Sequence, residues 1–258
     1  MGLLDTESIA YAIGETIRQM GGNVIYTVQN ERMKRIFIAR SKALTDEEKA
    51  RLDFRYCEIT DDEEVRKLFE ELPDVAGVVH SIAYANPKTC LGEEFHTSEV
   101  EDIKKALEIS SISLATVARH AQNSMRAGGS ILALTFDTRH VYPGYNWMGV
   151  CKSALEAIVR GLARRHGRPR IRINALSAGP LATKAATSIP GFSGLGGLWN
   201  NMSPLPWDTS ESKQDVAYAA AYLLGPYSKM ITGETIHVDG GASIIAGSLL
   251  PHELPVPQ

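Results

Sequence analysis

Hydrophobic positions in this chain alternate between a spacing typical of helices and one typical of buried strands. Residues 8–20 carry apolar side chains at helical spacing, and Gly21 and Gly22 follow as an end signal. Short apolar or β-branched runs then recur between further helical patterns. The expected strands are 23–28, 53–57, 77–82, 130–135, 172–176 and 235–238. Strands that alternate with helices in this way predict βαβ units and a parallel sheet.

This alternation predicts an α/β protein, a single-domain Rossmann-like fold with a doubly wound parallel sheet. No linker or internal repeat divides the chain, so we expect one domain over 1–248 and a flexible, proline-rich tail over 249–258. Residues 181–210 interrupt the pattern with Gly, Ser, Pro and Asn. We expect a long loop there, and such loops inside compact domains are usually functional.

The first strand of such a sheet is missing from the pattern. A doubly wound domain normally opens with a strand that leads into a glycine-rich turn and then the first helix. Here the turn and the helix are present, but only Met1 precedes them. We expect either an unpaired ladder on each neighbouring strand or direct pairing of those two strands. The resulting hypothesis is that the true start lies about ten residues upstream, which leaves room for one further strand.

Composition narrows the class of protein. The 258 residues are 44% hydrophobic and 22% charged, as in ordinary globular proteins, and the net charge of -3 argues against general nucleic-acid or membrane-surface binding. No apolar run of about 18 residues and no signal peptide is present, so we expect a cytoplasmic protein. Cys57, Cys90 and Cys151 have no metal-ligand spacing and are expected to be reduced. No metal site is predicted.

The segment 2–10 has more than one interpretation. Gly2, followed by Ser8-Ile9-Ala10 at the start of a helix, is typical of a loop that offers free N–H groups to a pyrophosphate. The alternative is a disordered N-terminus in which Ser8 only caps the helix. Gly2 also fits the loose pattern for N-myristoylation, although one lipid chain anchors a protein only weakly.

Gln29 follows the strand 23–28, at the position where this fold contacts the adenosine ribose of a dinucleotide. Its neutral amide suits a free 2′-hydroxyl better than a 2′-phosphate. The basic residues Arg32, Lys34 and Arg35 lie close behind and leave a phosphate open. The alternative is an ordinary turn between a strand and a helix.

Two other strand ends carry polar residues. Thr183 follows the turn Ser177–Pro180, and its hydroxyl suits a phosphate or a carboxamide. The alternative is a turn before a flexible connection. His80 ends an apolar strand, and a lone histidine there is more often a buried structural residue than a catalytic one. We therefore assign His80 no role.

Tyr145 and Lys152 are the strongest candidates for chemistry. They stand seven positions apart, so in a helix they lie two turns apart on one face and both can reach one cofactor and substrate. A cationic neighbour makes a phenol a better proton donor or acceptor near neutral pH. Many helices carry this spacing by chance, so the pair acquires meaning only from the rest of the chain.

Taken in order, these motifs resemble those of the NADH-dependent enoyl-acyl-carrier-protein reductases of bacterial fatty-acid synthesis, a divergent branch of the short-chain dehydrogenase/reductase superfamily. The resemblance runs from Gly2 to about Ile244. In this branch six residues separate the tyrosine from the lysine, whereas three separate them in ketone and alcohol enzymes. The motifs are Gly2-x5-Ser8-Ile9-Ala10, Gln29-Asn30, His80-Ser-Ile82, Ile109-Ser-Ser111, Tyr145-x6-Lys152, Asn174-Ala-Leu-Ser-Ala-Gly-Pro180 and His237-Val-Asp-Gly-Gly241.

The resemblance implies reduction of the 2,3 double bond of trans-2-enoyl thioesters by hydride from NADH, with NADPH not excluded. Tyr145 would bond to the thioester carbonyl oxygen, and Lys152 would hold the nicotinamide ribose. The residues implied to line the cofactor are Gly2, Ser8, Ile9, Gln29, Glu58, Ile59, Ser81, Ile82, Ala83, Lys152, Leu181 and Thr183. Those implied to contact the substrate are Ala85, Phe136, Tyr145, Ile189 and Phe192.

The resemblance also implies a homotetramer and a substrate carried on acyl carrier protein. Phe136 stands where many relatives carry a second tyrosine, and it is similar to the mycobacterial long-chain enzymes, which favours longer acyl chains. Residues 189–197 lack the basic side chains that often meet the acidic carrier. Docking of the carrier would then be weak or would use the arginine run of residues 160–172, which is otherwise a solvated helix end, or the substrate would be a coenzyme A thioester.

Two other functions stay open from the sequence. One is a related reductase that acts on a ketone or on coenzyme A esters, which the six-residue spacing disfavours. The other is an inactive pseudoenzyme that lacks its central strand and serves at most as a binding partner. The intact pair Tyr145 and Lys152 argues against such decay.

Overall fold

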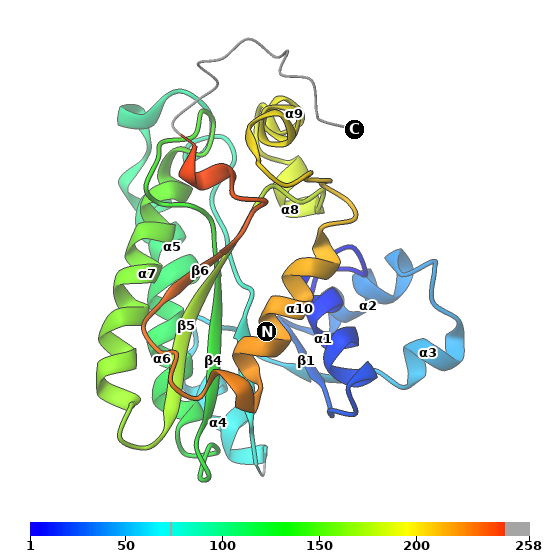
Figure 1. Cartoon of the computed structure of the whole chain (residues 1–258). Coiled ribbons are helices and arrows are strands. Elements are labelled where there is room, and N and C mark those ends of the chain that lie inside the picture. The colour runs from blue at the N-terminus through cyan, green and yellow to red at the C-terminus, as the bar shows by residue number, and fades with distance from the viewer. Residues whose placement is uncertain (73, 246–258) are drawn as a thin grey trace, which may run out of the picture.

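The strands of this chain form two parallel sheets. The computed structural model describes residues 1–72 and 74–245 (Figure 1). The strands are β1 (Ile25–Val28), β2 (Asp53–Tyr56), β3 (Gly77–His80), β4 (Gly129–Thr135), β5 (Ile171–Ala178) and β6 (Thr235–Val238). β1 pairs with β2, and the second sheet has the order β3-β4-β5-β6, with every pairing parallel. The predicted parallel α/β fold is therefore confirmed, with each strand at its expected place.

Helices cover both faces of the second sheet (Figure 1). One face is covered by α1 (Ile9–Gln19) and α10 (Lys213–Leu224), which also pack against each other. The opposite face is covered by α4 (Asp62–Glu71), α6 (Ser113–Ala121) and α7 (Asn146–His166). The other helices are α2 (Glu31–Arg40), α3 (Asp46–Ala50), α5 (Val100–Leu107), α8 (Lys184–Thr187) and α9 (Phe192–Met202). Short 3-10 turns occupy Phe95–Thr97, Pro226–Ser228 and Ala242–Ile244, and a π turn occupies Glu108–Ile112.

Each face of the sheet has its own hydrophobic core. On the α7 side, Leu155 and Val159 pack with Ile131 and Ile173 of the central strands. These side chains are fully buried or nearly so, and burying each contributes about 1.5–3 kcal/mol. Burial on both faces favours apolar central strands, which explains the apolar run at residues 131–134 of β4, whereas β5 is mostly buried but also carries polar residues.

The first helix begins and ends where its sequence signals predict. The Ser8 hydroxyl oxygen accepts a hydrogen bond from Tyr11 N at 3.2 Å and so caps α1. At the other end, Gly21 has a φ of +86°, a conformation that glycine adopts without strain. Gly22 N donates to Ile17 O at 2.9 Å, which closes the last turn of the helix.

Residues 1–3 lie between the two sheets. Met1 N donates to Val79 O at 2.6 Å, and Ser81 N donates to Met1 O at 3.2 Å, so Met1 bonds to the β3 side. Leu3 N donates to Thr27 O of β1 at 3.2 Å. Within residues 1–72 and 74–245, β1 and β3 do not pair with each other. Of the two expected arrangements, the structure shows the one in which the neighbouring ladders stay separate.

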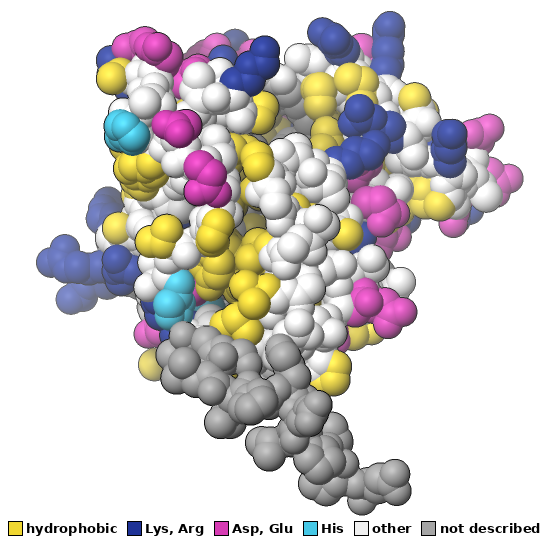
Figure 2. All heavy atoms as spheres, turned by 90° about the horizontal axis from the view of Figure 1, so that it is seen from above, with side chains coloured by type: hydrophobic (Ala, Val, Ile, Leu, Met, Phe, Trp, Pro, Cys, Tyr) yellow, Lys and Arg dark blue, Asp and Glu magenta, His cyan; other side chains and the backbone are white. Residues whose placement is uncertain are grey.

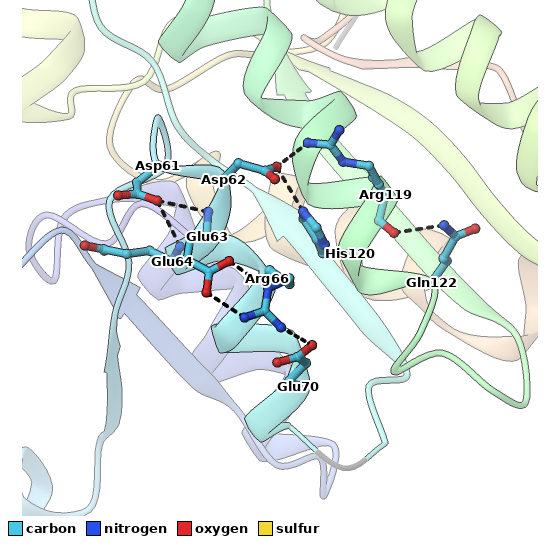
Figure 3. Close-up of polar contacts among 9 residues, drawn as sticks. All are labelled: Asp61, Asp62, Glu63, Glu64, Arg66, Glu70, Arg119, His120 and Gln122. Atoms are coloured by element: carbon cyan, nitrogen blue, oxygen red, sulfur yellow. Dashed lines mark hydrogen bonds and ion pairs between the residues drawn. The ribbon is translucent and has the colours of Figure 1, made fainter.

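Polar contacts join α4 to α6 at the surface (Figure 3). The Asp61 carboxylate accepts hydrogen bonds from Glu63 N at 2.9 Å and Glu64 N at 3.1 Å and caps α4. The Asp62 carboxylate contacts both Arg119 and His120 of α6. Such exposed ion pairs usually contribute only about 0–1 kcal/mol each, so they orient the two helices more than they stabilise them.

The segment 181–210 is more ordered than expected, because it contains α8 and α9. Propensity alone argues against a helix at α9, since its sequence includes three glycines. Packing outweighs propensity: Trp199 is buried, and its indole N–H donates to Asp239 O at 2.9 Å. The expectation of a continuous loop was therefore wrong. The predicted tail, 249–258, lies outside the described residues.

Candidate active site

Tyr145 and Lys152 lie at the end of α7 that faces the carboxyl edge of the sheet. Tyr145 directly precedes the helix, and Lys152 follows in its second turn. Lys152 Nζ donates to Leu134 O, near the end of β4, at 2.8 Å. The side chain is almost fully enclosed, and burial lowers the pKa of Lys152 to about 8. The ammonium is therefore charged at neutral pH but lies close to its titration range.

Burial raises the pKa of the Tyr145 phenol well above its ordinary value, with the nearby Cys151 thiol as a smaller cause. The sequence suggested the opposite direction, with a cationic neighbour that makes the phenol more acidic. That expectation was wrong, because the ammonium of Lys152 bonds to a backbone carbonyl while the phenol lies in apolar surroundings. Tyr145 is thus a neutral hydrogen-bond donor at physiological pH.

Aromatic rings form one wall beside Tyr145. The Phe136 ring lies 5.1 Å from that of Tyr145, 4.8 Å from that of Tyr142 and 5.5 Å from that of Trp199, measured between centroids. Such edge-to-face and tilted contacts are favourable between aromatic side chains. Phe136 was a candidate from the sequence, but Tyr142 and Trp199 were not. Tyr142 stands three residues before Tyr145, and that proximity was the only available signal.

The carboxylate of Asp137 is hydrogen-bonded to Tyr142, one of the residues of this wall. It accepts hydrogen bonds from Tyr142 Oη at 2.8 Å and Arg139 Nε at 3.0 Å, and it contacts His140 Nδ1 at 2.7 Å. His237 of β6 lies 3.5 Å away. Burial alone would raise the pKa of Asp137, but these hydrogen bonds outweigh it and lower the pKa to about 2.

The predicted substrate residues lie around the same wall. Ala85 packs in the cluster that contains Tyr145 and Met148. Ile189 and Phe192 are half-buried and flank Pro190. A side chain on Gly144 would come within 2.5 Å of the Pro190 carbonyl oxygen, so this segment touches the residue that precedes Tyr145. Contact of Ile189 and Phe192 with an acyl chain stays a prediction.

Figure 2 looks down on the face at the upper end of Figure 1, where α8 and α9 lie. Hydrophobic side chains gather in a band across the middle of this face. Basic and acidic side chains lie on both sides of the band, toward the outer parts of the face. An apolar centre with polar surroundings is typical of a site for a small organic ligand.

Gly2 is the centre of a second group of predicted residues. Its φ is +88°, and a side chain there would collide with the Ser81 carbonyl oxygen and come within 2.8 Å of Ile82 Cγ1. Only glycine allows the backbone to approach the end of β3 so closely. Gly2, Ser81 and Ile82 are therefore brought together, as the resemblance implies for the cofactor. Ala83 follows them at an exposed position.

The loop that follows Gly2 leads to the N-terminal end of α1. The Ser8 hydroxyl caps the helix through Tyr11 N, so the cap leaves the amides of Ile9 and Ala10 at the end of the helix. Free amides at a helix N-terminus suit an anion. Asp5, which the sequence did not indicate, lies in the same loop with a buried carboxylate. Its Oδ2 has no hydrogen-bond partner among the described residues, and Lys184 Nζ lies 3.7 Å away.

Gln29 and Glu58 meet at the ends of β1 and β2. The Gln29 side-chain amide donates to the Glu58 carboxylate, which also accepts from Thr60 N at 3.1 Å. Partial burial raises the pKa of Glu58, but these hydrogen bonds outweigh it and lower the pKa. Ile59 beside it is buried in the core. The pair Gln29 and Glu58 thus offers amide and carboxylate groups that suit ribose hydroxyls and an adenine amino group.

Leu181 and Thr183 lie where β5 leads into α8. The Leu181 side chain is buried in the core, so only its backbone is available to a cofactor. The Thr183 hydroxyl oxygen accepts from Ala186 N at 3.2 Å and caps α8. Its O–H remains a donor, as expected from the sequence. These groups follow the carboxyl ends of the strands or begin the first helix, the places where a doubly wound fold binds a dinucleotide.

His80 and the serines of the motif Ile109-Ser-Ser111 connect elements of the scaffold. His80 Nε2 lies 2.8 Å from Ser113 Oγ, and burial lowers the pKa of His80 to about 3. Ser111 Oγ donates to Cys151 O of α7 at 2.7 Å, and Ser110 Oγ donates to Tyr84 O at 2.9 Å. These contacts agree with the structural role expected for His80.

The arginine run lies far from Tyr145. Arg160, Arg164 and Arg165 occupy the last turns of α7, at the end of the helix opposite to the candidate site. Arg170 precedes β5 at the other edge of the sheet. Arg172 does not belong to a solvated helix end, because its guanidinium donates to Leu223 O at 2.8 Å and Gly225 O at 3.1 Å. The run therefore does not border the candidate site.

The described residues contain neither a helix that could cross a membrane nor a cluster that could hold a metal ion. None of the helices combines the length and apolar character that a membrane crossing requires. No group of three or more His, Cys, Asp or Glu side chains in this part of the chain is arranged to hold a metal ion. The cysteines Cys57, Cys90 and Cys151 are buried and free.

Comparison with known proteins identifies the family. The sequence model described as enoyl-(acyl carrier protein) reductase matches residues 2–243. The NADH-dependent enoyl-acyl-carrier-protein reductase FabI of Bacillus cereus is 36% identical over 250 residues, which cover 95% of each chain. The NADPH-dependent FabI of Staphylococcus aureus is 36% identical over 246 residues, which cover 93% of this chain and 94% of the relative.

A solved structure agrees in fold as well as in sequence. The Bacillus cereus enoyl-acyl carrier protein reductase, crystallised with NADP+ and indole naphthyridinone, superposes with a TM-score of 0.86 at 34% identity. The match covers 95% of each chain. Together with the motifs around Tyr145 and Lys152, these matches show that this chain belongs to the enoyl-acyl-carrier-protein reductase family.

Proposed function

We propose that this chain reduces the 2,3 double bond of trans-2-enoyl thioesters carried on acyl carrier protein, with NADH as the hydride donor. This reaction is the final step of the fatty-acid elongation cycle. The observation that carries the proposal is the position of Tyr145, a neutral phenol beside an apolar wall, two helical turns from the charged Lys152. The family and its named relatives support the same activity.

Tyr145 is proposed to stabilise the charge that develops on the substrate. NADH, when bound, supplies the hydride that the β-carbon receives, and negative charge then appears on the thioester carbonyl oxygen. Tyr145 donates a hydrogen bond to that oxygen, a donor aimed at the developing charge. Its raised pKa keeps the proton on the phenol throughout. A proton added to the α-carbon completes the saturated acyl chain.

Lys152 is proposed to hold the ribose next to the nicotinamide. An ammonium has three N–H donors, and Leu134 O accepts one of them. The other two are free to bond to ribose hydroxyls. The hydrogen bond to Leu134 also directs the side chain toward the carboxyl edge of β4, so Lys152 is oriented before the cofactor arrives.

The other cofactor contacts are proposed from their places around the same edge. Gly2 and the N-terminal amides of α1 would meet the pyrophosphate, and Thr183 would add its hydroxyl. Gln29 and Glu58, with Ile59, would border the adenosine. NADPH is the alternative cofactor, because the basic residues of α2 follow Gln29 and a named relative uses NADPH. Ala85, Phe136, Ile189 and Phe192 are proposed to contact the acyl chain.

We propose a homotetramer as the working form. Exposed apolar side chains on two different parts of the surface support subunit contacts, namely Val100 and Ile112 on one and Tyr218 and Tyr222 of α10 on the other. A cytoplasmic location is proposed from the three free cysteines. The arginine run lies at the far end of α7, so the carrier is proposed to meet the edge that holds α8 and α9 instead.

The test is a spectrophotometric assay of NADH oxidation with a 2-enoyl thioester on acyl carrier protein, and with its coenzyme A analogue. Tyr145→Phe removes one donor to a developing negative charge, which typically lowers kcat about 10²-fold. The dissociation constant of NADH should stay within about twofold, because the phenol contacts the substrate rather than the cofactor. Undiminished reduction by Tyr145→Phe would refute the role of the phenol, and no reduction by the natural enzyme would refute the activity.

A further inference from the structure

The residues on either side of Tyr145 are held by a single residue of another segment. Gly92 N donates to Gly144 O at 2.9 Å, and Gly92 O accepts from Asn146 Nδ2 at 3.1 Å. Both backbone groups of Gly92 are thus used on the two neighbours of the tyrosine. Because one bond involves the backbone before Tyr145 and the other the side chain after it, the two bonds anchor the chain on both sides of the tyrosine.

The same segment continues along the first turn of α7. Trp147 N donates to Cys90 O at 3.2 Å, and its indole N–H donates to Phe95 O at 2.9 Å. The rings of Trp147 and Phe95 stack with centroids 4.7 Å apart. Residues 90–95 therefore form a brace, and four hydrogen bonds tie it to residues 144–147. Tyr145 is the one residue of that stretch that makes none of these four bonds.

The backbone of Asn146 is strained. Its φ is +45°, although it is the first residue of a 21-residue α-helix. Asn146 and Arg170 are the two residues other than glycine with a positive φ in the described structure. Asparagine tolerates this left-handed conformation better than most side chains, and glycine tolerates it best. Strained backbone of this kind persists where surrounding structure enforces it, often at functional sites.

Position 146 therefore combines two requirements. The backbone needs a residue that accepts a positive φ, and the brace needs a side-chain donor that reaches Gly92 O. Glycine meets only the first requirement, whereas asparagine meets both. The Asn146 side chain makes no second hydrogen bond among the described residues, since its Oδ1 is buried without a partner. The hydrogen bond to Gly92 O is thus the only one that the Asn146 side chain makes among the described residues.

We propose that Asn146 is a positioning residue, which acts through Gly92 and the brace to hold the Tyr145 hydroxyl in line with the substrate carbonyl. The proposal rests on the proposed function of Tyr145 as the donor to the thioester. A small displacement of a positioned donor is costly in rate, because the hydrogen bond must be aligned in the transition state. Binding of the cofactor does not depend on that alignment.

The test is Asn146→Gly, which accepts the left-handed backbone and removes the side chain that carries the donor. We expect kcat for a 2-enoyl thioester to fall about 10-fold, with the dissociation constant of NADH within about twofold of the natural enzyme. In a Tyr145→Phe background the same substitution should have no further effect, because the hydroxyl that it positions is absent. A structural role alone would lower activity equally in both backgrounds.

The matched control is Arg170→Gly, which relieves the other positive φ at the far end of α7. It should leave kcat unchanged. Equal kcat for Asn146→Gly and the natural enzyme would overturn the positioning role while leaving the proposed activity intact. A further 10-fold loss on top of Tyr145→Phe would overturn it too. Absence of thioester reduction by the natural enzyme, with NADH still bound, would instead remove the proposed function on which the inference rests.

Discussion

The rings of Phe136 and Tyr145 meet edge to face, with centroids 5.1 Å apart and an angle of 62° between their planes. This contact covers one side of the tyrosine ring. It also explains why the pKa of the phenol is raised, since burial disfavours the phenolate. The Phe136 ring thus both orients the Tyr145 phenol and contributes to the burial that keeps it protonated.

Replacing Phe136 by alanine should change the preference of the enzyme for acyl length. The ring contacts Tyr142, Tyr145 and Trp199, so its removal opens the wall and loosens Tyr145. We expect kcat/KM to fall by about 10-fold or more for long-chain enoyl thioesters, because each lost apolar contact weakens binding of the chain. A four-carbon thioester should lose less. Assays with four-carbon and twelve-carbon substrates measure the ratio, and an unchanged ratio would separate Phe136 from the acyl site.

Gly2→Ala should disrupt the close approach of residue 2 to Ser81, which is proposed to form part of the cofactor site, and should also destabilise the fold. Alanine at a φ of +88° is strained, and its Cβ would collide with the backbone of Ser81. We expect the free energy of unfolding to fall by about 2–4 kcal/mol, the sum of the strain and the overpacking. Thermal unfolding with and without NADH measures both effects. Gly21→Ala is the matched control, because Gly21 has a φ of +86° but open space around it, and should cost only about 1–2 kcal/mol.

Asp5→Asn should tighten binding of NADH. The Asp5 carboxylate is buried beside the end of α1 that is proposed to meet the pyrophosphate, and like charges repel there. Asparagine keeps the acceptor for Glu7 N, which now bonds to Asp5 Oδ1 at 3.1 Å. We expect the dissociation constant to fall about 5-fold at low salt, as for the removal of about 1 kcal/mol of repulsion.

Two other variants check the charge argument at Asp5. Lys184→Met should weaken binding of NADH, because Lys184 Nζ lies 3.7 Å from Asp5 Oδ2 and offsets its charge. Glu7→Gln should have little effect, since the Glu7 side chain is mostly exposed and its charge is screened. Fluorescence titration with NADH measures all three. Weaker binding by Asp5→Asn would show that the carboxylate orders the loop rather than repels the ligand.

The sequence predicted the scaffold well because burial on both faces of the sheet leaves a clear pattern. β4 carries an apolar run at residues 131–134, β5 is mostly buried, and each structural strand begins and ends within about two residues of its expected place. The start of α1 was equally clear, since Ser8 is a standard cap. These features depend on residues close together in the chain, which is why they were visible.

What the sequence did not predict depends on contacts between distant residues. Trp199 turns a glycine-rich segment into a helix because it packs against Phe136 and bonds to Asp239. The pKa of Tyr145 rises because of burial, which the spacing to Lys152 cannot reveal. Asn146 has an ordinary place in the motif, and only the structure shows its left-handed backbone and its bond to Gly92.

Lys152→Met should stabilise the protein while it weakens the cofactor site. Burial lowers the pKa of Lys152 from 10.5 to about 8, so the folded state carries a charge that is costly to enclose. Each pKa unit corresponds to about 1.4 kcal/mol, and the lost bond to Leu134 O offsets part of the gain. We expect the free energy of unfolding at pH 7 to rise by about 1–3 kcal/mol and binding of NADH to weaken.

The pH dependence of that gain provides the check. Between about pH 8 and pH 10.5 the unfolded natural chain still holds the Lys152 proton that the folded chain has released, so the stability of the natural enzyme rises with pH. The advantage of Lys152→Met should therefore be largest below pH 8 and shrink toward pH 10.5. Affinity of the natural enzyme for NADH should fall over the same range, as the ammonium loses its charge. Denaturant unfolding at pH 7 and pH 10 measures the first effect, and a gain that grows with pH would contradict the role of burial.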